Sequence, residues 1–199
     1  MCIRDREEIK RIEKLTFGED QQYLKTIQQF FLICLWCGFR FSTAISLLPS
    51  DIKQTKEGLI VEKLKIAKTN KRLFLPLYLL GVKNENGLTK SEQLVKDLLE
   101  QRSLEAGGQL VEFKALPFFG FTLQYYNRAL KVLAKLAGIK KHCSSHICRR
   151  SFASLMVNEF GVPLSLVKKM MQHDDIRTCL LYTSPSPRDA TLSRMPSSA

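Results

Sequence analysis

Apolar residues recur at intervals of three and four in the early part of the chain, which is the spacing of one face of an α-helix. A first amphipathic helix is predicted over residues 7–15. A longer helix follows Asp20, whose side chain can cap its first turn. Gly38 ends that helix, because glycine readily adopts the left-handed backbone that terminates helices. The apolar positions of the two helices are Ile9, Ile12 and Leu15, then Tyr23, Ile27, Phe30, Phe31 and Cys34.

Two apolar runs rich in branched residues, 58–62 and 73–77, predict two β-strands. Residues 67–72 between them are polar and predict a turn, so the two runs form an antiparallel hairpin with basic residues at its tip. Before this hairpin, Ser42 can cap a short helix that Pro49 ends.

The remaining part of the chain has helical periodicity. Thr89 and Glu92 have the spacing of a capping box, in which the two side chains satisfy backbone N–H groups at a helix start. Thr122 can begin the next helix, Arg149 lies at the head of another, and Pro163 suits the start of a last one. The inward positions of the helix after Thr122 are Leu123, Tyr126, Leu130 and Leu133. The expected fold class is therefore mainly α with a small antiparallel β-hairpin or sheet (α+β), without internal repeats.

The net positive charge of the chain limits the kinds of binding partner to be expected. The 199 residues include 31 Lys and Arg against 19 Asp and Glu, a net charge of +12, and the isoelectric point is about 9.5. Such an excess favours a polyanion as partner, with nucleic acid ahead of an anionic membrane surface. No apolar run approaches the roughly 18 residues that a membrane span needs, so no membrane partner is expected.

Cysteine usage indicates the compartment. The 6 cysteines have no disulfide-framework spacing, and residues 1–6 contain no apolar signal-peptide region. We therefore expect reduced thiols in a cytoplasmic protein. Cys34 and Cys37 fall within an apolar helix rather than on a turn, which favours core packing over a zinc site. A second set with metal-binding side chains is His142, Cys143, His146 and Cys148.

The two ends differ in composition from the rest of the chain. Residues 179–199 are rich in Ser, Pro and Thr and have no helical or strand period. Together with residues 1–6 they resemble translated sequencing-adapter sequence. We therefore expect a non-native leader at 1–6, a C-terminally truncated domain over 7–178, and a non-native, disordered tail at 179–199.

Candidate chemistry is concentrated in six side chains. Two of them form a His-x-x-Arg motif at His146 and Arg149, and Tyr182 lies nine residues after His173. Guanidinium and ammonium groups can bind phosphate oxygens, imidazole can exchange a proton, and a tyrosine hydroxyl can act as a nucleophile. In chain order the six are Arg40, Lys68, His146, Arg149, His173 and Tyr182.

This order of side chains resembles the catalytic domain of the tyrosine recombinases, the phage-integrase family, over roughly residues 7–178. Residues 127–131 and 137–139 resemble the helix that precedes the family's His-x-x-Arg motif. The resemblance implies a site-specific DNA recombinase or integrase that cleaves and rejoins double-stranded DNA through a 3′-phosphotyrosyl intermediate. It also implies a homotetramer on DNA, with no metal, no energy cofactor and no small-molecule substrate. The N-terminal arm-type domain usual in the family is expected to be absent or truncated.

The resemblance assigns roles to the cationic residues. Attack on a phosphodiester adds negative charge to the nonbridging oxygens of phosphorus, and fixed guanidinium groups can meet that charge with two hydrogen bonds each. Arg40 and Arg149 are the expected pair. Lys68, which lies on the hairpin connection, is expected to protonate the leaving 5′ oxygen, with Lys71 and Lys65 as alternatives.

The remaining three residues are expected to act on the nucleophile and the phosphate. His146 and His173 can bind the phosphate or accept the tyrosine proton, and Tyr182 stands at the position of the nucleophile. Pro185 and Pro187 exclude a helix that continues past this tyrosine, which is where the family has one.

Two departures from the family pattern affect the expected site. Thr43 stands where the family commonly has an acid that orients neighbouring groups, and Gln172 replaces a common glycine before His173. Ordinary structural roles compete with the catalytic ones, since Arg40 could bind helix carbonyls. Two other functions stay open: a basic DNA-binding module that cannot cleave, and an enzyme resembling a type IB topoisomerase.

Overall fold

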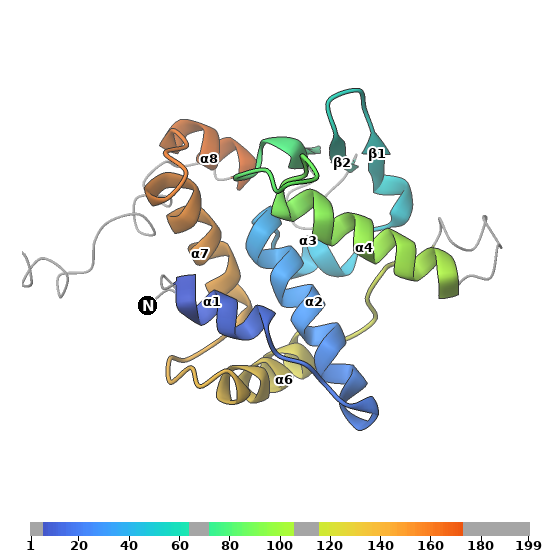
Figure 1. Ribbon diagram of the computed structural model, residues 1–199, viewed down its shortest axis with the longest axis vertical. Helices are drawn as coiled ribbons and strands as arrows, with labels where there is room; N and C mark the ends of the chain where they lie inside the picture. Colours follow the sequence, from blue (N-terminus) through green and yellow to red (C-terminus); the bar gives the residue numbers. More distant parts are fainter. Residues whose placement is uncertain (1–5, 64–71, 106–115, 173–199) are drawn as a thin grey trace, which may run out of the picture.

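The computed structural model describes residues 6–63, 72–105 and 116–172. These residues form a helical body with a small sheet at one end (Figure 1). The α-helices are α1 (Arg6–Glu13), α2 (Gln22–Cys37), α3 (Phe41–Ile45), α4 (Lys90–Glu105), α6 (Leu123–Leu136), α7 (Ser145–Asn158) and α8 (Leu164–Met170). The strands are β1 (Ile52–Gln54), β2 (Leu59–Lys63) and β3 (Leu73–Pro76), and the 3-10 helices are η1 (Glu19–Gln21), η2 (Pro49–Asp51) and η3 (Leu77–Leu79).

The sheet is antiparallel, with the strand order β1-β2-β3. Val61 of the central strand lies opposite Ile52 on one side and Leu75 on the other. Leu73 and Leu75 are buried and Phe74 between them is exposed, as expected for a sheet with one face on the core. The sequence predicts the β2–β3 hairpin but not β1, which has only three residues and little apolar character of its own.

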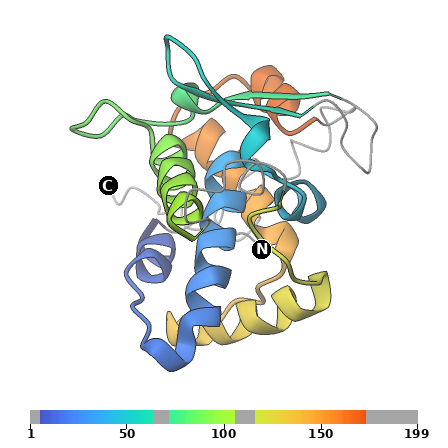
Figure 2. The same cartoon turned by 90° about the vertical axis from the view of Figure 1, so that its right-hand side faces the viewer.

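Helix α2 is the centre of the helical body. Figures 1 and 2 show it passing through the middle of the molecule, with α6 at one end and the sheet at the other. A helix that is apolar on nearly all sides is stable only when other elements cover it. Helices α4, α6 and α7 all pack against α2 and provide this cover. Its buried side chains include Leu24, Ile27, Phe30, Phe31, Ile33, Cys34, Leu35 and Cys37.

An aromatic cluster connects α2 to the segment before α6. The ring of Phe30 lies with its centroid 5.4 Å from that of Phe41, 5.0 Å from Phe119, 4.9 Å from Phe121 and 4.8 Å from Tyr126. Three of the four contacts are edge-to-face, which is a favoured geometry for aromatic rings. The cluster fixes residues 118–121 against the body, although they have no regular secondary structure.

Several local predictions are confirmed. Gly38 ends α2 with a left-handed backbone, at φ 66°. The capping box forms, because the Thr89 N–H donates to Oε2 of Glu92 at 3.0 Å and the Glu92 N–H donates to Oγ1 of Thr89 at 3.2 Å. The Thr122 hydroxyl accepts from the Tyr125 N–H at 3.2 Å and caps α6. The fold class, mainly α with a small antiparallel sheet, is confirmed as well, and no helix in the described segments is long and apolar enough to cross a membrane.

Three local predictions are wrong. Asp20 lies inside η1 and does not cap α2, whose N-cap residue is Gln21. Ser42 lies within α3, which begins one residue after Arg40. Leu123 was expected to face inward but is 43% exposed, because the first turn of α6 extends beyond the elements that cover the rest of the helix. In each case the contacts of the folded chain override a local preference.

Candidate functional site

The side chain of Arg149 lies in the interior, where α7 packs against α2. Its Nη1 donates a hydrogen bond of 2.6 Å to the carbonyl oxygen of Gly38, which lies 111 positions earlier in the chain. Only 8% of Arg149 is exposed, and a buried cation is costly unless polar groups surround it. The negative end of the α2 dipole also favours a cation here. The fold therefore fixes the Arg149 guanidinium at the C-terminal end of α2.

Gly38 makes this approach possible. A Cβ at position 38 would lie 2.6 Å from Cδ1 of Phe152, far inside van der Waals contact. Since Phe152 lies on α7, the absence of a side chain at Gly38 lets α7 come close to the end of α2 and brings Arg149 onto the Gly38 carbonyl. The chain then turns, and Arg40 becomes the N-cap residue of α3.

Arg40 reaches the last residue that the structure describes. Its Nη2 donates a hydrogen bond of 3.4 Å to the carbonyl oxygen of Gln172, just beyond α8. The side-chain amide of Gln172 donates in turn to the carbonyl oxygen of Arg72 at 3.2 Å. Arg40, Arg149 and Gln172 thus come from separate parts of the sequence to the region around Gly38, next to the start of β3.

His146 lies in the first turn of α7 and is exposed. It lines a cleft of about 290 Å³ together with His142, Ser144, Ile147 and Arg150. Two imidazoles, a guanidinium, a hydroxyl and the positive end of the α7 dipole make this cleft suitable for an anion. We call it the His146 cleft. The zinc interpretation of His142 and His146 gains no support, because the described residues contain no group of three or more potential metal ligands.

The other predicted site residues lie outside the described residues. They are Lys68, His173 and Tyr182, together with the alternative lysines Lys65 and Lys71. Two described residues border them: Arg72 directly follows Lys71, and Gln172 directly precedes His173. The hydrogen bond between Gln172 and Arg72 therefore joins the two described positions that are nearest in sequence to these candidates.

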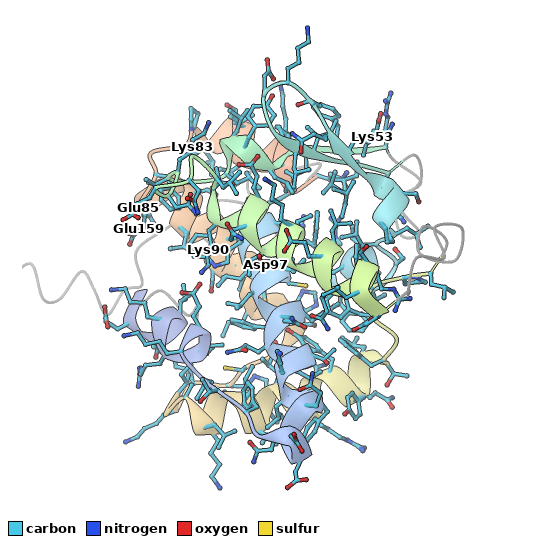
Figure 3. All side chains as sticks on the ribbon, turned by 45° about the vertical axis from the view of Figure 1, so that its right-hand side comes forward. Lys53, Lys83, Glu85, Lys90, Asp97 and Glu159 are labelled. Atoms are coloured by element: carbon cyan, nitrogen blue, oxygen red, sulfur yellow. The ribbon has the colours of Figure 1, made fainter. Side chains whose placement is uncertain are left out.

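The sheet beside Gln172 is stabilised by ion pairs. Glu62 of β2 pairs with Arg72 and also with Lys53 of β1, at 2.5 Å to the Lys53 ammonium. Figure 3 shows Lys53 at the sheet end of the molecule, away from Lys90 and Asp97 on α4. The pair of Arg72 and Glu62 connects the start of β3 to the central strand, so the carbonyl that Gln172 contacts belongs to a residue anchored on the sheet.

The buried thiols act as core side chains, as the helical position of Cys34 and Cys37 predicts. Burial raises the pKa of the Cys37 and Cys148 thiols to about 12, because a thiolate would lose its hydration there. The Cys148 sulfur also lies 3.7 Å from the buried hydroxyl of Tyr126. These thiols stay protonated at neutral pH, which makes them poor nucleophiles and poor metal ligands.

Sequence reasoning missed the contribution of Gln172, Arg72 and Arg150 to this region. In the sequence Gln172 only replaces a common glycine, and its two long-range contacts have no signal in the local sequence. Arg150 could have been found, because His142, His146 and Arg150 are spaced by four residues around a helix start and so fall on one side.

In this mainly α domain one arginine, Arg149, is bonded to the Gly38 carbonyl at a helix end, and a second, Arg40, follows Gly38 by two residues. Guanidinium groups of this kind are suited to bind phosphate. A family model described as "Phage integrase family" matches residues 5–188. The chain belongs to the phage integrase family.

Two relatives show how much of a longer protein the chain covers. It is 28% identical over 189 residues to the tyrosine recombinase XerD of Bradyrhizobium diazoefficiens, covering 88% of this chain and 55% of the relative. It is 30% identical over 159 residues to XerD of Rickettsia bellii, covering 73% of this chain and 47% of the relative. The chain thus spans about half the length of these curated relatives.

Solved structures share the fold. The XerA recombinase superposes with a TM-score of 0.63 at 19% identity, over 98% of this chain and 65% of that one. XerH site-specific recombinase in a pre-cleavage complex with difH substrate gives 0.64 at 18% identity, over 93% and 49%. A lambda integrase dimer bound to a COC′ core site gives 0.56 at 15%, over 92% and 57%. The fold is therefore that of a tyrosine recombinase catalytic domain.

Proposed function

We propose that this chain is the catalytic domain of a site-specific DNA recombinase or integrase, which cleaves and rejoins strands of duplex DNA through a 3′-phosphotyrosyl intermediate. Family membership supports this function. The net charge of +12 supports a polyanionic partner. The XerH and lambda integrase structures that share the fold are complexes with DNA.

The observation that carries the proposal is the convergence of Arg40 and Arg149 around Gly38. Arg149 is buried and bonded to the Gly38 carbonyl, and Arg40 follows two residues later with its side chain directed to Gln172. The Arg149 guanidinium is therefore held in place before a substrate binds, and the Arg40 guanidinium has one hydrogen bond to the Gln172 carbonyl. Preorganised cations stabilise the negative charge that develops on a phosphate far better than mobile ones do, because they need no reorganisation.

The reaction then follows from the residue types. The Tyr182 oxygen forms a bond to phosphorus while the bond from phosphorus to O5′ breaks, and O5′ keeps the electron pair. A lysine of the β2–β3 connection, Lys68 first, gives O5′ a proton. His146 or His173 accepts the tyrosine proton. In the reverse step a 5′ hydroxyl attacks the phosphotyrosine and reseals the strand, so no metal or energy cofactor is needed.

Assembly follows from the same chemistry. Exchange between two duplexes requires four strand cleavages, and one nucleophile per chain implies four chains, so a homotetramer forms on two DNA sites. The His146 cleft contributes a further contact to the DNA backbone at the head of α7. A DNA substrate and buried reduced thiols are both consistent with a protein that works in the cytoplasm.

A suicide substrate tests the proposal. Duplex DNA with a nick placed just after the cleavage point loses its short 5′-hydroxyl fragment, so the covalent complex accumulates. A denaturing gel should show a protein–DNA band when a native C-terminal segment follows residue 178. With residues 179–199 as written we expect DNA binding but little or no band, because Pro185 and Pro187 exclude the helix that would hold the tyrosine in place. Chelator should leave the band unchanged. Absence of the band from the domain with a native C-terminal segment, with DNA binding intact, would reject the catalytic proposal.

A DNA-binding module without cleavage is the second candidate. It is favoured by Thr43, a buried residue of α3 just after Arg40, at a position where an acid is common in the family. A threonine cannot orient neighbouring groups by charge. The gel separates the two functions, because a binding module shifts DNA in a native gel but gives no band under denaturing conditions. Relaxation of supercoiled plasmid would instead favour the topoisomerase-like reaction.

A further inference from the structure

The start of α7 is capped by a residue of another helix. Ser144 and Ser145 both stand at this start, and serine is among the preferred capping residues. Ser144 is the N-cap residue, yet its side chain makes no capping hydrogen bond. The N–H of Ser145 instead donates a hydrogen bond of 3.0 Å to Oδ1 of Asn127, which lies on α6, 18 positions earlier. An N–H in the first turn has no partner within its own helix, so Asn127 supplies the acceptor.

This hydrogen bond acts on the turn that carries His146. Ser145 is the first residue of α7 and His146 is the second, so Asn127 fixes the backbone one residue before the imidazole. Asn127 is partly buried, whereas His146 is exposed and lines the His146 cleft. A hydrogen bond shielded from water is stronger than one that competes with it, so the position of this turn depends on Asn127.

The connection between α6 and α7 is held a second time, by α1. The Lys141 ammonium pairs with Oε2 of Glu8 at 2.7 Å, and Glu8 is buried. Separating this pair would leave a buried carboxylate without its cation, which is costly. The chain is thus held against α1 at Lys141 and against α6 at Ser145. His142, which also lines the cleft, lies between these two points.

We propose that Asn127 is a positioning residue, which fixes the head of α7 so that the His146 imidazole is held where it contacts a DNA phosphate. The inference rests on the proposed function, in which the His146 cleft binds the DNA backbone. The action of Asn127 is indirect, because its Oδ1 is engaged by the N–H of Ser145. Without this acceptor the first turn of α7 would be free to shift, and a displacement of about 1 Å is enough to weaken a contact that depends on exact placement.

Two substitutions separate the acceptor from the size of the side chain. Asn127→Leu keeps a similar size but removes the acceptor, so the N–H of Ser145 loses its partner. Asn127→Asp keeps an acceptor oxygen, and its negative charge suits the positive end of the α7 dipole. Asn84→Leu is the matched control. Oδ1 of Asn84 accepts from the N–H groups of Asn86 and Leu88, both at 3.0 Å, on a turn that carries none of the candidate site residues.

Amide hydrogen exchange of the chain without DNA tests the contact itself. Peptides covering residues 145–148 should exchange faster in Asn127→Leu than in the parent, and at the parental rate in Asn127→Asp and Asn84→Leu. Both leucine variants should lower Tm by about 1–8 °C, because each loses a side-chain acceptor for backbone N–H groups. Parental exchange of residues 145–148 in Asn127→Leu would overturn the proposal, since the head of α7 would then not depend on Asn127.

A double-mutant cycle on affinity for duplex DNA separates a positioning role from a purely structural one. In an anisotropy titration Asn127→Leu and His146→Ala should each weaken binding about threefold or more. The double variant should bind within about twofold of His146→Ala, because the two residues act through one contact. Asn84→Leu should stay within about twofold of the parent.

Three outcomes of the titration would reject the inference while the parent still binds DNA. They are strictly additive losses in the cycle, parental affinity of Asn127→Leu, and a loss in Asn84→Leu as large as that in Asn127→Leu. The last of these would attribute the weaker binding to lower stability alone. A parent chain that binds no duplex DNA would instead reject the proposed function, and the phosphate contact of His146 with it.

Discussion

Replacing Gly38 with alanine tests the packing that places the two arginines. The new Cβ would lie 2.6 Å from Cδ1, 2.7 Å from Cε1 and 2.9 Å from Cγ of the Phe152 ring. The ring is fully buried, so it cannot swing away into solvent. The backbone at position 38 also has a φ of 66°, which alanine disfavours. Either the ring and α7 move outward, or the end of α2 changes conformation.

The size of the effect follows from these two costs. A left-handed residue with a Cβ costs about 1–2 kcal/mol, and overpacking a filled core costs about 1–3 kcal/mol. The free energy of unfolding should therefore fall by on the order of 3 kcal/mol. For a domain of about this length, 1 kcal/mol shifts Tm by roughly 2–4 °C, so we expect Gly38→Ala to lower Tm by about 6–12 °C.

Gly161→Ala is the matched control. Its φ is 62°, nearly the same as that of Gly38, but a Cβ there meets no atom within 4 Å. It should lower Tm by only about 2–8 °C, from the backbone cost alone. Cleavage of the suicide substrate should fall with Gly38→Ala and not with Gly161→Ala, since the Gly38 carbonyl accepts from Arg149. Thermal melting measures the first effect, and a denaturing gel of the covalent complex measures the second. Equal Tm values for the two variants would refute the clash with Phe152.

Three further predictions concern charge and titration. Arg149→Met should keep the fold and DNA binding but reduce suicide-substrate cleavage by about 10² or more, and parental cleavage would contradict the phosphate role. Affinity for duplex DNA should fall at least about tenfold between roughly 50 and 200 mM salt in an anisotropy titration, and salt-independent binding would contradict a phosphate interface. Burial raises the pKa of Cys37 and Cys148 to about 12, so their neutral thiols stabilise the fold fully below the unfolded pKa near ~8.5. This contribution is lost as pH rises toward 12. The urea concentration at the unfolding midpoint should therefore be lower at about pH 10.5 than at about pH 8, and an equal midpoint at the two pH values would contradict the prediction.

The parts of the fold that could be predicted from sequence depend on interactions close along the chain. The capping box of Thr89 and Glu92 is complete within four residues, and the end of α2 at Gly38 depends on one residue. The apolar residues of α2 and α7 likewise recur at helical spacing, because the faces that carry them are buried in the fold. These signals require no knowledge of which element becomes the neighbour.

The missed features depend on partners far along the chain. Strand β1 exists because Ile52 and Lys53 pair with β2, since three residues alone have little strand preference. Ser42 is a better capping residue than Arg40, yet the turn after Gly38 makes Arg40 the N-cap residue. A preference worth less than about 1 kcal/mol is overruled by the packing of α2 against α7.

The candidate site also has features that the sequence predicts and features that depend on residues far along the chain. Residue type and spacing pointed to Arg40 and Arg149, and the structure locates both around Gly38. Spacing could not indicate that Arg149 is buried against a backbone carbonyl, or that His146 faces a cleft with Arg150. Those facts depend on where α7 lies relative to α2. Lys68, His173 and Tyr182 stay predictions from sequence.

The two departures from the family pattern, Thr43 and Gln172, both bear on the position of the Arg40 side chain. Thr43 cannot orient Arg40 by charge, because it has no carboxylate. The partner that Arg40 has in the described residues is the carbonyl of Gln172, at 3.4 Å. A glycine at position 172 would offer the same carbonyl, but its greater backbone freedom would leave that oxygen less fixed in direction. The hydrogen bond from the Gln172 side-chain amide to the Arg72 carbonyl restricts that freedom, so we expect the second departure to compensate for the first. If so, restoring an acid with Thr43→Glu should reduce the effect of Gln172→Gly on DNA cleavage, and strictly additive effects in a double-mutant cycle would show that the two positions act independently.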